Sequence, residues 1–188
     1  EPLFAVPHGI VLLLSLLAAI AFLAEGAMLD WGALLVIGAH LLPATQAGMG
    51  YILFSVAMTF SRLIGDRLTQ RIGALAMLCG GPLLALIGIA VLLLVPAPMV
   101  ALSGFVLIGL GIANIAPILF RLAGKQTLMP TGLAIATLTT IGYAGVLLGP
   151  AGIGFAANLL TLKGAFWLLA GLLCVIPLCA RRTVHSTR

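Results

Sequence analysis

The sequence has very few charged side chains. Nine Lys and Arg and four Asp and Glu occur among 188 residues, and 63% of the chain is hydrophobic. Soluble domains are about 45–50% apolar and about 25% charged. No charged residue occurs between Arg71 and Arg121, or between Lys125 and Lys163. Because a helix of about 20 apolar residues crosses a bilayer core, the composition excludes a soluble fold and indicates a polytopic membrane protein.

Several patterns that carry chemistry are also absent. Cys79, Cys174 and Cys179 have no CxxC spacing, so we expect neither a disulfide framework nor a zinc site, and no metal or cofactor. No basic stretch is interleaved with aromatic residues, which argues against a nucleic-acid partner. No GxSG nucleophile motif occurs, and Asp30 and Asp66 are predicted at opposite membrane faces. We therefore do not expect an enzyme.

What the sequence does contain is six long apolar segments. The backbone of a membrane span must satisfy its hydrogen bonds within helices or a closed barrel. The segments are continuously apolar and lack the alternation of barrel strands, so we predict an all-α fold. The predicted spans are 9–42, 48–64, 72–95, 99–120, 131–158 and 163–180. The first is too long for one straight crossing, and we expect it to bend at Gly26, Gly32 or Gly38.

The basic residues alternate between the connections. All but one of the nine follow the second, fourth or sixth span: Arg62, Arg67, Arg71, Arg121, Lys125, Arg181, Arg182 and Arg188. Only Lys163 lies in a connection of the opposite side. The positive-inside rule therefore predicts that both termini are cytoplasmic. We expect a transmembrane domain over 9–180 and a basic cytoplasmic tail over 181–188.

Two acidic residues lie in the first span. At 1.5 Å per residue from position 9, Glu25 lies about 24 Å along the helix and Asp30 about 31 Å. This predicts Glu25 in the outer part of the bilayer and Asp30 near the interface. An ionised carboxylate there needs water or a partner, so we interpret both as candidates for a substrate or proton pathway. The alternative is a structural acid bonded to a neighbouring helix.

A polar stripe follows the second span. The spacing of Tyr51, Ser55, Thr59 and Arg62 puts them on one helix face. Such a face should contact protein or water rather than lipid, so it is a candidate lining of a solute path. Hydrogen bonding between helices would explain it equally well.

The fourth span combines Asn114 with Pro117 near its end. Proline lacks an N–H, so Pro117 frees the carbonyl of Ala113. A loosened backbone beside a side-chain amide can form a binding or hinge site. It can equally be a tolerated kink.

Small residues form a seam along the fifth span. Gly142, Gly145, Gly149 and Gly152 recur at spacings of three and four, and Pro150 suggests a bend. Such seams let two helix backbones approach closely. The seam therefore predicts helix packing, and a smooth surface of this kind also suits helices that slide during a conformational change.

Several motifs resemble those of the major facilitator superfamily. The segment 61–73, which holds Gly65-Asp66-Arg67 and then Arg71, is similar to its cytoplasmic signature loop after helix 2, with the weaker form found after helix 8. Ser61 and Thr69 stand where the family often has glycine. The run GVLLGPAGIG at 145–154 resembles its GP motif. The stretches 24–31 and 111–120 resemble the bacterial fucose-permease-like branch.

The resemblance implies helices 7–12 of a twelve-helix secondary transporter. Residues 1–8 would end a central cytoplasmic linker, and the groups 9–95 and 99–180 would be an inverted three-helix repeat. The cytoplasmic gating loop would comprise Arg62, Gly65, Asp66, Arg67 and Arg71. Asp66 would meet a helix N-terminus in the missing N-terminal six-helix half, unless it pairs with Arg62 four residues away.

The function implied is alternating-access transport of a small sugar-like or drug-like solute through a bacterial inner membrane. Proton coupling through Glu25 would accompany it. The partners would be the solute, the lipid bilayer and the N-terminal half. The alternative is a membrane sensor or scaffold that does not transport.

Overall fold

The computed structural model describes residues 9–187, and the regular elements in this range are all helical. They are α1 (Gly9–Gly38), η1 (Ala44–Gln46), α2 (Met49–Ile72), α3 (Ala74–Leu94), α4 (Pro98–Ile112), α5 (Ile115–Lys125), α6 (Thr131–Leu159), α7 (Leu162–Leu173) and α8 (Val175–His185). The pairs α4–α5 and α7–α8 each form one interrupted span, which gives six helices long and apolar enough to cross a membrane. The predicted all-α fold with six spans is confirmed. The expected linker at 1–8 lies outside the described residues.

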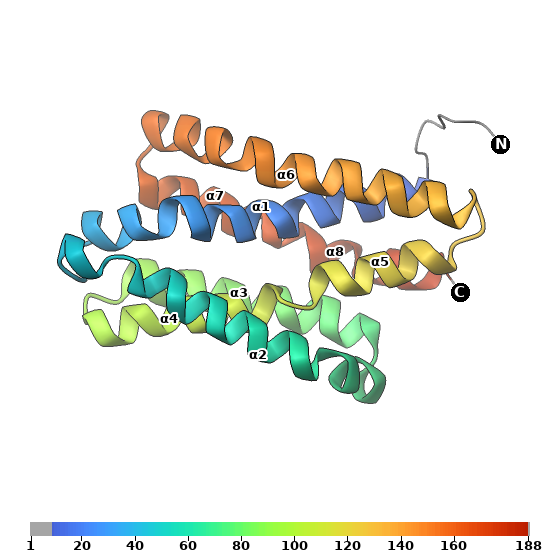
Figure 1. Ribbon diagram of the computed structural model, residues 1–188, viewed down its shortest axis with the longest axis horizontal. Helices are drawn as coiled ribbons and strands as arrows, with labels where there is room; N and C mark the ends of the chain where they lie inside the picture. The colour runs from blue at the N-terminus through green and yellow to red at the C-terminus, as the bar shows by residue number, and fades with distance from the viewer. Residues whose placement is uncertain (1–8, 188) are drawn as a thin grey trace.

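The spans run antiparallel, and their connections alternate between the two ends of the bundle (Figure 1). The α2–α3 and α5–α6 connections lie at the same end as the start of α1 and the end of α8. This end, called here the basic end, carries the side chains of Arg67, Arg71 and Lys125. Lys163 lies at the opposite end, at the start of α7. The fold therefore separates the basic residues along the bundle axis.

Four helix boundaries differ from the expected ones. α2 continues to Ile72, so most of the segment 61–73 is helix and not a loop. Charged residues do not end a helix where it leaves the apolar layer, whereas Gly73, with φ of +88°, does. α5 likewise continues to Lys125, and residues 181–185 belong to α8. α1 is one helix that ends at Gly38 rather than at 42.

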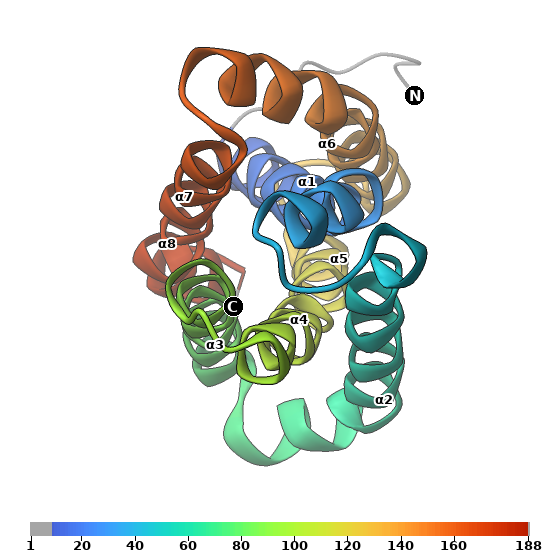
Figure 2. The ribbon, with the colours of Figure 1, turned by 90° about the vertical axis from the view of Figure 1, so that its left-hand side faces the viewer.

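The two three-helix groups pack reciprocally. The first helix of one group contacts the second helix of the other, so that α1 lies along α6 and α4 lies along α2. The end-on view shows α1 between α6 and α5, with α3, α7 and α8 on the far side from α2 (Figure 2). α1 and the α4–α5 span are the most buried, with 56% and 67% of their apolar windows inside the bundle. This exchange fits the inverted repeat that the resemblance implies.

Glycines bring α3 and α4 into backbone contact. A Cβ on Gly88 would lie 2.7 Å from the carbonyl oxygen of Gly104, and one on Gly81 would lie 2.5 Å from that of Gly111. Gly81 and Gly88 on α3 are seven residues apart, as are Gly104 and Gly111 on α4, and seven residues are about two helical turns. No side chain larger than hydrogen fits between these helices, so this glycine seam sets their separation. The sequence analysis did not identify it.

The seam of α6 packs on α1, but only over part of its length. A Cβ on Gly145 would overlap the carbonyl oxygen of Ala19, and one on Gly142 or Gly149 would touch α1 side chains. Gly152 has open space around it and does not belong to this contact. α6 continues through Pro150, whose carbonyl oxygen accepts a hydrogen bond from Trp31 Nε1 at 3.2 Å.

A matched pair of substitutions tests the α6 seam. Gly145→Ala should lower the free energy of unfolding by about 1–3 kcal/mol, because the added methyl group meets backbone that cannot move aside. Gly152→Ala should change it by less than ~1 kcal/mol, because alanine favours helix and the space is open. Thermal unfolding of the purified protein in detergent measures both. Equal melting temperatures for the two variants would contradict the packing described.

Candidate functional site

An ion pair joins α1 to α2 near the middle of the bundle. Arg62 Nη2 donates to Glu25 Oε2 at 3.2 Å. Arg62 was expected both on the polar face of the second span and in the cytoplasmic gating loop, and it lies in the interior of α2 because that helix continues to Ile72. Glu25 was expected in the outer bilayer. α1 rises about 45 Å over its 30 residues, so Glu25 is close to its midpoint.

The pair borders a hollow of about 280 Å³ between α1, α2 and α6. The lining residues are Phe22, Glu25, Gly26, Leu29, Tyr51, Arg62, Tyr143 and Val146. The rings of Phe22 and Tyr143, which both line it, stack on one another with centroids 5.3 Å apart and planes 17° from parallel. Ligand pockets commonly enclose about 300–1,000 Å³, so this hollow has the size of a small binding site.

Both charged side chains are accessible from this hollow. The exposed fraction is 34% for Glu25 and 44% for Arg62. Charges at mid-height of a membrane helix are rare, and they typically face an aqueous cavity or a ligand path. The pair can therefore bind a solute or a proton from the hollow, and it also joins α1 to α2.

Arg62 also contacts the interrupted span. Its Nε donates to the carbonyl oxygen of Ala113 at 3.3 Å. Pro117, four residues further on, has no N–H for that carbonyl, so the acceptor predicted from the sequence is present and Arg62 occupies it. A charged side chain in the hollow is thus connected to the break between α4 and α5.

Asn114 lies at that break but not in the hollow. Its Nδ2 donates to the carbonyl oxygen and to Oγ of Ser61, at 3.1 and 3.0 Å, and Ser61 Oγ donates to Leu110 O at 3.0 Å. Gly65 lies in close contact with the same amide, and a Cβ at position 65 would overlap Asn114 Oδ1. Asn114 was expected on a substrate pathway. It is buried, with its Nδ2 bonded to Ser61 and its Oδ1 packed against Gly65, so it joins α2 to the α4–α5 break.

The remaining polar residues of α2 separate into two groups. Tyr51 lines the hollow beside Glu25, whereas Ser55 and Thr59 border a second hollow of about 380 Å³ with apolar neighbours. Thr59 Oγ1 donates to Ser55 O at 2.8 Å, which satisfies its hydroxyl within the helix. Asp30 is exposed and lines neither hollow. Glu25 and Asp30 therefore do not share one cavity.

A second ion pair lies nearer the basic end. Arg121 Nη2 donates to Asp66 Oδ1 at 2.8 Å and connects α2 to α5. The alternative in which Asp66 pairs with Arg62 is wrong, since Arg62 pairs with Glu25 instead. Asp66 is 79% exposed, so a further partner can still approach it. Arg67 and Arg71 are exposed in the last turns of α2.

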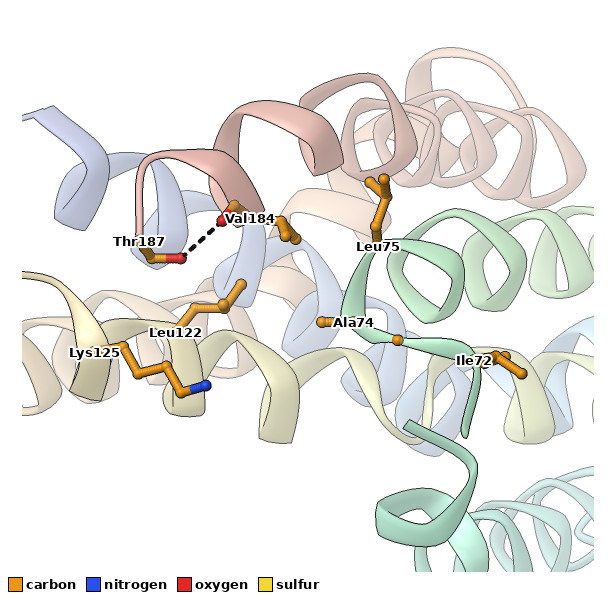
Figure 3. A pocket seen from close by; sticks show the side chains of 8 residues that line it. Ile72, Ala74, Leu75, Leu122, Lys125, Val184 and Thr187 are labelled. Carbon is orange, nitrogen blue, oxygen red and sulfur yellow. Dashed lines mark hydrogen bonds between the residues drawn. The ribbon is translucent and has the colours of Figure 1, made fainter. Parts of the chain in front are cut away.

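A further hollow, of about 700 Å³, opens at the basic end (Figure 3). Leu122 and Lys125 reach it from α5, and Val184 reaches it from α8. The hydroxyl of Thr187 donates to Thr183 O at 2.9 Å. Lys125 is the one charged side chain among its lining residues. Within residues 9–187 no group of three His, Cys, Asp or Glu residues could hold a metal.

Comparison with known proteins places the chain in a family. It is 47% identical over 180 residues to an uncharacterised MFS-type transporter of Yersinia pestis, across 96% of this chain. The chain belongs to the major facilitator superfamily. An uncharacterised transporter of Sinorhizobium fredii is 32% identical over 163 residues, and the membrane protein MosC of Rhizobium meliloti is 30% identical over 148. No protein-family model matches the chain.

This facilitator chain is shorter than its relatives. It spans 47% of the Yersinia protein, 43% of the Sinorhizobium protein and 36% of MosC. The match to the Sinorhizobium protein covers 87% of this chain, and the match to MosC covers 79%. Six spans in such a length match half of a major facilitator fold. The resemblance described from the sequence motifs is confirmed at the level of the family.

The joint between Gly65 and Asn114 can be tested by a double-mutant cycle. Gly65→Ala should lower the free energy of unfolding by about 1–3 kcal/mol, because the methyl group displaces the Asn114 amide. Gly65→Ala combined with Asn114→Ala should cost less than the sum of the single changes, by about 0.5–3 kcal/mol. Thermal unfolding in detergent measures this. Gly124→Ala, in open space on α5, is the control, and strict additivity would refute the contact.

Proposed function

We propose that this chain is the C-terminal six-helix half of a secondary active transporter that moves a small solute by alternating access. The observation that carries the proposal is the Glu25–Arg62 pair, which lines an aromatic hollow at mid-height of the bundle. Secondary transporters bind their solutes near the bilayer midplane, beside helices interrupted by Gly or Pro. The broken α4–α5 span, with Pro117 next to the pair, has that character.

A second six-helix half would cover the face formed by α1, α2, α5 and α6. The outward side chains of α2 on this side are large and apolar: Ile52, Val56, Phe60 and Leu63 are 53–77% exposed. α2 and α6 are also poorly buried, with 33% and 22% of their apolar stretches inside the bundle, compared with 56% for α1. A partner half would enclose the hollow and complete the solute path.

The gating residues would act at the basic end. The Asp66–Arg121 pair ties α2 to α5, and Arg67 and Arg71 present charge beside it. Rocking of one half against the other would make and break contacts with this group. The positive-inside rule puts the basic end, and both termini, on the cytoplasmic side of a bacterial inner membrane.

The solute would be small and without net charge, sugar-like or drug-like. The hollow has one acidic and one basic side chain, and no acidic cluster or array of cations that would select a metal ion or a polyanion. Protons would couple through Glu25, because protonation of its carboxylate removes the charge that holds Arg62.

Cysteine labelling separates a transporter from a scaffold built on the same fold. In a variant without the three native cysteines, Thr59→Cys should react with a water-soluble maleimide far faster than Leu83→Cys, which points outward from α3. In intact cells Lys163→Cys should react and Arg71→Cys should not, if the basic end is cytoplasmic. Labelling of Thr59→Cys as slow as that of Leu83→Cys, in cells and in inverted vesicles, would favour the scaffold.

Proton coupling is tested by Glu25→Gln. Transport by the complete gene product in proteoliposomes should depend on an imposed pH gradient, and the transport that remains in Glu25→Gln should lose that dependence. Asp30→Asn, a carboxylate change outside the hollow on the same helix, should keep it. Unchanged pH dependence in Glu25→Gln would exclude Glu25 as the coupling residue.

A further inference from the structure

The charges in the hollow indicate a class of solute. We propose that the solute is a small amphipathic zwitterion, whose cationic group binds Glu25, whose anionic group binds Arg62, and whose apolar part lies on Phe22 and Tyr143. This inference rests on the proposed function, because it names the solute of the same hollow. The solute would then have no net charge because it carries one positive and one negative group.

The first argument is the charge balance of the hollow. Glu25 and Arg62 are its only charged lining residues among those described, one of each sign. A solute with a single positive group would occupy Glu25 and leave the Arg62 guanidinium without its carboxylate, and a single negative group would do the reverse. Once a partner half encloses the hollow and excludes water, an unpaired charge in it would be strongly unfavourable. A zwitterion replaces both partners, so every charge stays paired.

The second argument is the unused hydrogen-bonding capacity of the pair. A guanidinium has five N–H donors, and the bonds of Arg62 within the described residues use Nε and Nη2. Glu25 engages Oε2 in the same pair, and its Oε1 makes no hydrogen bond within residues 9–187. Both side chains are partly exposed to the hollow. A ligand can therefore bond to each group while Ala113 still holds Arg62 in place.

The third argument is the distribution of apolar surface. Phe22 lies one helical turn from Glu25 on α1, and the stacked pair of Phe22 and Tyr143 lines the same hollow as the carboxylate. Tyr51, stacked on Phe54 with centroids 5.9 Å apart, contributes a third ring. Aromatic faces bind apolar and planar groups. About 280 Å³ suits a solute of amino-acid size rather than a large drug.

Four probes on one carbon skeleton test the charge requirement. They are phenylalanine as the zwitterion, phenylalanine amide as the cation, 3-phenylpropionate as the anion and 3-phenylpropionamide as the neutral compound, with a matching set on the smaller leucine skeleton. Binding to the complete gene product in detergent is measured by calorimetry and by the shift in melting temperature. On at least one skeleton the zwitterion should bind at least tenfold more tightly than its three analogues.

Two substitutions should shift the ratio of anion to cation affinity in opposite directions. Glu25→Gln should move the ratio of anion to cation affinity at least tenfold towards the anion, and Arg62→Gln should move it at least tenfold towards the cation. Asp30→Asn is the matched control and should leave the order unchanged, because Asp30 does not line the hollow. If one variant fails to fold, as judged by its melting curve, the other still gives a signed result.

The outcomes that overturn the inference are specific. They are a neutral or singly charged probe that binds as tightly as the zwitterion, failure of all eight probes to bind, and substitutions that weaken every probe equally. In each case Thr59→Cys labelling would still report on the proposed transport path independently. Conversely, charge-selective binding without accessibility of Thr59→Cys would support the zwitterion site and contradict transport.

Discussion

Arg62 is the residue through which three spans meet at mid-height. One guanidinium binds the carboxylate of Glu25 on α1 and the backbone of Ala113 at the α4–α5 break, while its own helix carries Ser61 and Gly65 against Asn114. An arginine suits this position because its planar group presents several donors in fixed directions. The relative heights of α1, α2 and α4–α5, and with them the hollow, depend on these contacts.

Around this polar centre the helices are held by small residues rather than by large apolar ones. Lipid tails are as apolar as leucine, so burial of hydrocarbon does not by itself drive helices together in a membrane. Close backbone approach does, and Gly81, Gly88, Gly104 and Gly111 provide it between α3 and α4. Along α6, Gly145 lies against the backbone of Ala19, Gly152 faces open space, and Gly154 lies against the ring of Trp31. The approach of α6 to the backbone of α1 is therefore closest at Gly145.

The fold could be predicted from the sequence because its main signal is physically strong. Long apolar segments must cross the bilayer as helices, and six of them can be recognised in the sequence. The helix ends were less predictable, since Arg67 and Arg71 indicate where α2 leaves the apolar layer and not where it stops. Gly73 carries that information through its positive φ.

Side-chain partners were beyond the sequence. Glu25 and Arg62 are 37 positions apart, and only the register between α1 and α2 brings them together. The local spacing instead suggested Arg62 with Asp66, and the structure pairs Asp66 with Arg121. The glycine seam of α3 and α4 was missed for the same reason. Two glycines seven residues apart on each helix indicate a close contact only once the two helices are known to be neighbours. Pro117 was different, since the loss of its N–H is local.

The contact between Arg62 and Ala113 has a consequence for how this protein tolerates sequence change. Its acceptor is a main-chain oxygen, so no substitution at position 113 removes the hydrogen-bonding atom. What keeps that oxygen available is the ring of a different residue, Pro117. Any other amino acid there supplies an N–H that competes with Arg62 for the carbonyl. The genetic determinant of this polar contact is therefore an apolar side chain one helical turn away, exposed on the surface of α5.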